Sequence, residues 1–146
     1  MTDIMDWNLC KTKFIRFVEK DEEKTSSIIE TAGKRLAFIK SNEAAKENIS
    51  FIVEGYYEII KELLVALLLK NGLKSSNHQC LISFFYKEYS DYEFEVNLIS
   101  QMSYLRNRLN YYGEEIDFDF YDKNKEEFDK IIDLIKKLIE DNTLKT

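Results

Sequence analysis

Apolar residues recur at three- and four-residue steps in five segments of the chain, and this spacing predicts amphipathic helices. The segments are residues 22–40, 43–70, 77–89, 91–112 and 123–141. The second segment becomes apolar all round near its end, so this part should lie at the centre of the core. Residues 1–20 carry no capping signal, and we expect them to be irregular or weakly helical.

Residues that cap helices support several of these boundaries. Asp21 and Asp122 are suited to accept hydrogen bonds from the first turns of the first and last segments. Asn71–Gly72 and Gly113 are suited to end the second and fourth segments, because glycine readily adopts the left-handed backbone conformation found after the last turn of a helix. The segment 91–112 also has a heptad seam, which is suited to packing along a neighbouring helix; its members are Leu98, Met102, Leu105, Leu109 and Tyr112.

Composition agrees with a helical fold. The 146 residues contain no proline and four glycines, whereas an all-β sandwich or barrel needs many turn residues. We therefore predict an all-α fold, an up-and-down helical bundle of four long helices plus one shorter helix at 77–89. Residues 1–146 fit a single domain.

Charge and cysteine usage narrow the possible functions. A net charge of −6 argues against non-specific nucleic-acid binding through bulk charge. The apolar run Leu63–Leu69 is too short to span a membrane. Cys10 and Cys80 form no spaced cluster, which argues against a disulfide framework and a structural zinc, and both are expected to be inert. We expect a cytoplasmic protein with no metal and no cofactor.

Side chains that could form a functional site cluster at the end of the fourth segment, in the run Arg106-Asn107-Arg108-Leu109-Asn110-Tyr111. In a helix, Arg106 and Asn110 lie one turn apart, as do Asn107 and Tyr111. One interpretation is structural, because arginines near a helix C-terminus interact favourably with the helix dipole. The other is a site in which guanidinium, carboxamide and phenol groups act together.

This run resembles the R-N-x-x-x-H signature of the HEPN domains (higher eukaryotes and prokaryotes nucleotide-binding), and residues 54–82 resemble the second helix of that family and the turn after it. The resemblance implies a homodimer and a minimal nucleotidyltransferase antitoxin as partner. Catalytic members of the family cleave RNA without a metal, with arginine and histidine meeting at the dimer interface. It also implies that Arg106 and Asn107 belong to the site.

The sequence departs from the family at the catalytic position, where Tyr111 replaces histidine, and Gly113 stands where a later tyrosine is frequent. An unperturbed phenol has a pKa near 10 and is ionised to about one part in a thousand at pH 7. Two hypotheses follow. One is a dimeric nucleotide-, RNA- or partner-binding module of a toxin–antitoxin-like system with a degenerate ribonuclease motif. The alternative is an active, metal-independent endoribonuclease that uses Arg106 and Tyr111.

Three other features have plainer interpretations. His78, the single histidine, is expected to be a surface or turn residue, unless folding brings it to Arg106. Glu54, Glu58 and Glu62 are expected to form a solvated helix face. The aromatic stretch that includes Phe118, Phe120 and Tyr121 is expected to pack or to meet a protein partner, because its acidic neighbours would repel phosphate.

Overall fold

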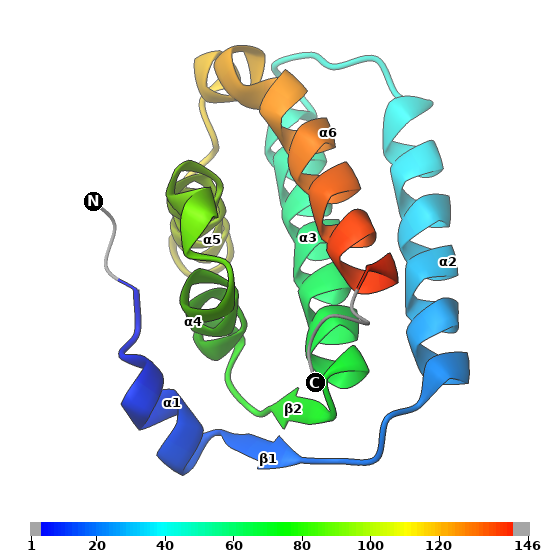
Figure 1. The fold of residues 1–146 in the computed structure, drawn as a ribbon. Helices are drawn as coiled ribbons and strands as arrows, with labels where there is room; N and C mark the ends of the chain where they lie inside the picture. Colours follow the sequence, from blue (N-terminus) through cyan, green and yellow to red (C-terminus); the bar gives the residue numbers. More distant parts are fainter. Residues whose placement is uncertain (1–3, 142–146) are drawn as a thin grey trace.

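The computed structural model describes residues 4–141, and most of them are helical (Figure 1). This confirms the prediction of an all-α fold. The elements are α1 (Trp7–Lys13), β1 (Ile15–Phe17), α2 (Glu22–Lys40), α3 (Ile49–Lys70), β2 (Leu73–Ser75), α4 (His78–Glu88), the 3-10 turn η1 (Ser90–Tyr92), α5 (Glu93–Tyr112) and α6 (Phe118–Glu140). The structure therefore adds α1 and a two-stranded sheet to the five expected helices.

Helix α3 is the centre of the fold. It packs against α2, α4, α5 and α6, and Figure 1 shows α2 at one edge with α6 crossing in front. Leu64 and Leu67 on α3 are 1% and 0% exposed. A helix with neighbours on several sides has little solvent-facing surface, which explains why its C-terminal half is apolar all round.

The N-terminal segment is more ordered than expected. Asp6 caps α1 by accepting a hydrogen bond from the backbone N–H of Leu9 at 3.1 Å. Strand β1 then pairs with β2 in antiparallel register, with Ile15 opposite Ser75. This pairing joins segments about 60 residues apart in the chain, so a local sequence pattern does not reveal it.

The structure corrects the expectation for the cysteines, because Cys10 on α1 and Cys80 on α4 form a disulfide with their Cα atoms 5.6 Å apart. Both residues are fully buried. Nearby, the rings of Trp7 and Phe84 lie 5.8 Å apart between the same two helices. Two cysteines 70 positions apart show no motif spacing, and only the docking of α1 on α4 brings them together.

Two helix starts also differ from the expected ones. Helix α3 begins at Ile49 rather than at 43, because the side chain of Asn48 holds the preceding turn by accepting from Ala45 N–H at 2.9 Å and donating to the Glu43 carbonyl at 2.9 Å. Helix α6 begins at Phe118, capped by Asp117, rather than at 123. Asp122 consequently lies inside α6, where it pairs with Lys125 at 3.1 Å.

Candidate functional site

The sequence-predicted arginine is held on the side of α5 that faces α3. An Nη atom of Arg106 lies 3.2 Å from a carboxylate oxygen of Glu58, and the two side chains are 23% and 25% exposed. The Arg106 guanidinium also donates to the Asn107 side-chain oxygen at 3.3 Å and lies over the Tyr57 ring, 5.8 Å from its centroid. Arg106 is therefore fixed in place and its charge is balanced within the protomer.

Neighbouring groups extend this ion pair into a network. Glu58 also pairs with Lys61 at 2.8 Å. With its amide nitrogen turned toward α3, Asn110 donates to Glu54 at 3.1 Å and accepts from Arg106 Nε at 3.3 Å. Glu54 and Glu58 are thus half-buried and partnered, which corrects the expectation of a solvated acidic face. A phosphate approaching Arg106 would have to compete with Glu58 for the guanidinium.

Tyr111 lies away from this network. Helix α5 continues unbroken to Tyr112, and residues five positions apart are separated by about 140° around a helix axis. The side chain of Tyr111 is 74% exposed. The structure therefore brings Arg106 and Asn107 together within one protomer, and it places Tyr111 on a different side of α5 from Arg106.

Tyr111 belongs instead to an outer surface of α5, together with Tyr104, Arg108 and Tyr112. The three tyrosines are 58%, 74% and 67% exposed, in chain order. The Arg108 guanidinium lies 4.3 Å from the centroid of the Tyr112 ring and 6.0 Å from that of Tyr104. Arg108 also pairs with Glu114. We call these four residues the α5 tyrosine surface.

The exposure of Tyr112 corrects the expected heptad seam, in which this residue was an inner position. Leu98 and Met102 are buried as expected. An α-helix has 3.6 residues per turn, so a strict seven-residue repeat drifts by about 20° per heptad. Over the two heptads from Leu98 to Tyr112 the drift carries the last position toward solvent.

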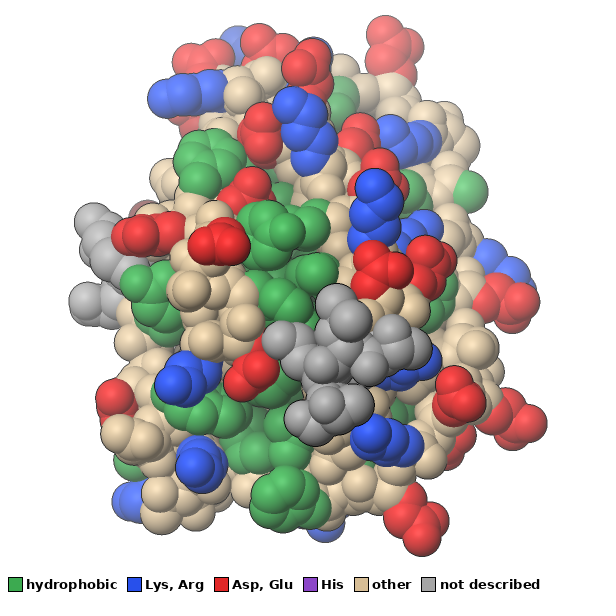
Figure 2. All heavy atoms as spheres, viewed as in Figure 1, with side chains coloured by type: hydrophobic (Ala, Val, Ile, Leu, Met, Phe, Trp, Pro, Cys, Tyr) green, Lys and Arg blue, Asp and Glu red, His purple; other side chains and the backbone are tan. Residues whose placement is uncertain are grey.

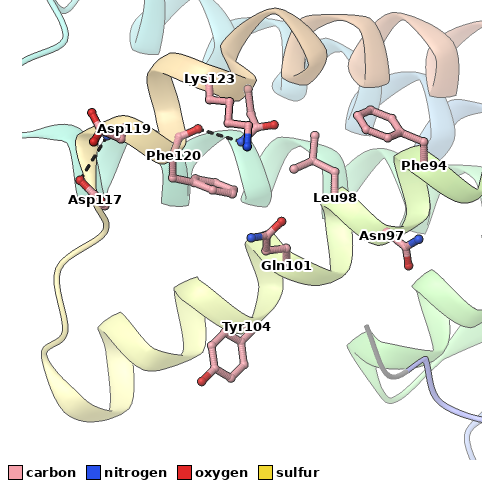
Figure 3. A pocket seen from close by; sticks show the side chains of 10 residues that line it. Phe94, Asn97, Leu98, Gln101, Tyr104, Asp117, Asp119, Phe120 and Lys123 are labelled. Atoms are coloured by element: carbon pink, nitrogen blue, oxygen red, sulfur yellow. Dashed lines mark hydrogen bonds between the residues drawn. The ribbon is translucent and has the colours of Figure 1, made fainter. Parts of the chain in front are cut away.

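A cleft of about 960 Å³ lies between α5 and the start of α6. Figure 3 shows Leu98, Gln101 and Tyr104 on its α5 side, with Asp119 and Phe120 on its α6 side. On the face drawn in Figure 2, hydrophobic side chains form a band between these helices, interrupted by acidic side chains. The mixed lining, with carboxylates at one end, does not favour a polyanionic ligand.

His78 lies in the first turn of α4, within electrostatic reach of the network around Arg106. The adjacent residue Gln79 donates to the Ser103 hydroxyl on α5 at 2.9 Å, which fixes this end of α4 against α5. Partial burial lowers the pKa of His78, and the positive charges of Lys61 and Arg106 lower it further, while Glu58 and Glu62 oppose them. Folding therefore brings the single histidine within electrostatic reach of Arg106.

In the described part of the chain, no group of three or more His, Cys, Asp or Glu side chains is placed to hold a metal ion. No helix among residues 4–141 is long and apolar enough to cross a membrane. No family model, curated protein or solved structure matches the chain. The resemblance to the HEPN domains consequently rests on the run from Arg106 to Tyr111 and on residues 54–82.

Proposed function

We propose that this protein is a HEPN-like bundle of four long helices plus one shorter helix that acts as a homodimeric binding module in a toxin–antitoxin-like system. In this proposal the ribonuclease motif is degenerate. The observation that carries it is the separation of the motif residues: Arg106 is neutralised by Glu58 on the inner side of α5, whereas Tyr111 is exposed on the outer side. An arginine paired in this way stabilises the end of the bundle rather than a transition state.

The α5 tyrosine surface supports a protein as the partner. Tyrosine and arginine are enriched at the centres of protein interfaces, where they supply most of the binding energy. The net charge of −6 disfavours a polyanion such as RNA. A minimal nucleotidyltransferase, the partner that the family resemblance implies, is therefore our proposed ligand for this surface.

Co-expression with a minimal nucleotidyltransferase, followed by co-purification, tests the proposal. We expect the two proteins to elute together, and Tyr111→Ala and Arg108→Ala each to weaken the complex at least tenfold, as expected for interface hot spots. Phe17→Ala is the matched control, because Phe17 is 90% exposed but lies on β1. A complex that tolerates both α5 variants, or no complex at all, would contradict the proposal.

A second candidate function, the metal-independent ribonuclease, is favoured by the position of His78 relative to Arg106. An imidazole titrates near neutral pH and can accept the proton of a ribose 2′-hydroxyl, which a phenol does poorly. If the protein cleaves RNA, His78→Asn should remove the activity. Tyr111→His should raise the activity at neutral pH if a second protomer brings this position to Arg106.

A further inference from the structure

Helices α2 and α3 leave a groove between them that no other element fills in the described part of the chain. It has a volume of about 470 Å³ and is lined by Lys34, Arg35 and Phe38 of α2 and by Phe51, Glu54 and Glu58 of α3. The rings of Phe38 and Phe51 are 72% and 66% exposed. Because α2 and α3 run in opposite directions (Figure 1), both rings lie toward the same end of the groove.

The two walls of the groove carry opposite charge. Lys34 and Arg35 make the α2 wall basic, and among residues 4–141 neither has a hydrogen-bond or ion-pair partner for its side chain. On the α3 wall, Glu54 contributes a carboxylate that no cation in the described part of the protomer balances, whereas the neighbouring Glu58 is already paired with Arg106 and Lys61. Among the described residues, no ion pair joins the two walls of the groove within one copy. A second copy that turned its α2 wall toward this α3 wall would therefore bring opposite charges together.

We propose that this groove is the interface of the homodimer, formed by two copies related by a two-fold axis that runs along the groove, parallel to α2 and α3. Such a rotation places the α2 wall of one copy on the α3 wall of the other. Arg35 of each copy then faces Glu54 of its partner, and Phe38 of each copy faces Phe51. The interface is isologous, since the same surface is used twice.

Charge selects this axis over the alternative. A two-fold axis in the same plane but across the helices would place α2 on α2, so that the basic walls of the two copies would meet. Like charges brought together in an interface are strongly unfavourable.

This inference rests on the homodimer of the proposed function, and it identifies the surface through which the two copies bind each other. Sedimentation equilibrium of full-length protein at tens of micromolar tests it, using Arg35→Glu and Glu54→Arg. Each variant alone places like charges in both symmetry-related contacts, and we expect its dimer to dissociate at least tenfold more readily than wild type. Arg16→Glu, an exposed arginine on β1, is the matched charge-reversal control and should remain dimeric.

An equimolar mixture of the two variants provides the sharper test. In a heterodimer of Arg35→Glu with Glu54→Arg, one contact has swapped charges and the other is native, so both are attractive and the wild-type affinity should return. Helicity by circular dichroism checks each fold, because Glu54 also bonds Asn110. If Glu54→Arg does not fold, Phe38→Asp takes its place and should give a monomer of native helicity.

The outcomes separate the two proposals. If single variants keep the wild-type dimer affinity, or if the mixture of folded variants fails to restore it, the groove interface is wrong while the homodimer stands. A wild-type protein that sediments only as a 17.4 kDa species overturns both. Binding of the nucleotidyltransferase is measured independently through Tyr111→Ala, so its loss would leave the groove interface unaffected.

Discussion

Removal of the Cys10–Cys80 bond should lower the stability of the protein substantially without abolishing its fold. The bond closes a loop with a sequence separation of 70. In the chain-entropy description of cross-links, closing a loop of this size lowers the conformational entropy of the unfolded chain, which raises its free energy by about 4 kcal/mol at 25 °C. The β1–β2 pairing and the Trp7–Phe84 contact still hold the N-terminal segment when the bond is absent.

The expected change in melting temperature follows from the size of the chain. Unfolding entropies near 2.1 cal/mol/K per residue give about 0.3 kcal/mol/K for a domain of this length, so a loss of about 4 kcal/mol lowers Tm by roughly 13 °C. The double variant Cys10→Ala/Cys80→Ala supplies the comparison, with alanine chosen because both positions are fully buried and serine would bring an unpaired hydroxyl.

Thermal unfolding followed by far-ultraviolet circular dichroism, with and without a reducing agent, measures this effect. Reducing agent should lower the Tm of the wild-type protein and leave that of the double alanine variant unchanged. Thiol titration under denaturing, non-reducing conditions should find no free thiol. Two free thiols, or a Tm that responds by less than about 2 °C, would refute the bond and restore the expectation of two inert cysteines in a reducing compartment.

Three further predictions concern the core and the site. Leu67→Ala should cost about 2–5 kcal/mol in chemical denaturation, because Leu67 is fully buried on α3; a loss below about 0.5 kcal/mol would mean that α3 is wrongly placed. A double-mutant cycle of Glu58→Gln and Arg106→Ala should give a coupling energy of about 1 kcal/mol, and a coupling near zero would contradict their ion pair. Because the pKa of His78 is lowered in the folded state, the unfolded chain binds the proton more readily, so stability should fall as pH drops from about 6.5 through the lowered pKa. His78→Asn should flatten that decline, and an unchanged slope would contradict the environment of His78.

The long amphipathic helices were predictable from the sequence because their signals are local. The stripes of α2, α3 and α6 and the left-handed stop at Gly113, with φ of 67°, depend on neighbours a few residues apart. The start of α6 is ambiguous in the sequence, because Asp117 and Asp122 are both suited to cap a helix; the aromatic residues between them pack along α6, which begins at Phe118. Strand β1 and the disulfide depend on contacts between distant segments, for which the chain shows no local pattern.

The candidate site was predictable only in part, for the same reason. Helical spacing alone places Arg106 and Tyr111 on different sides of α5. It cannot show that Glu58, 48 positions earlier, holds the guanidinium, or that α4 brings His78 within electrostatic reach of it. The stacking of Arg108 on Tyr104 and Tyr112 has no sequence signal, because an arginine between tyrosines on an exposed helix side is common.

Incubation of the purified protein with RNA in the presence of EDTA tests the central claim most directly, with Arg106→Ala purified in parallel. A binding module whose Arg106 is occupied by Glu58 should leave the RNA intact, and wild type and variant should behave identically. Cleavage by the wild-type protein that disappears in Arg106→Ala, while the variant keeps native helicity, would contradict the account and establish a metal-independent ribonuclease.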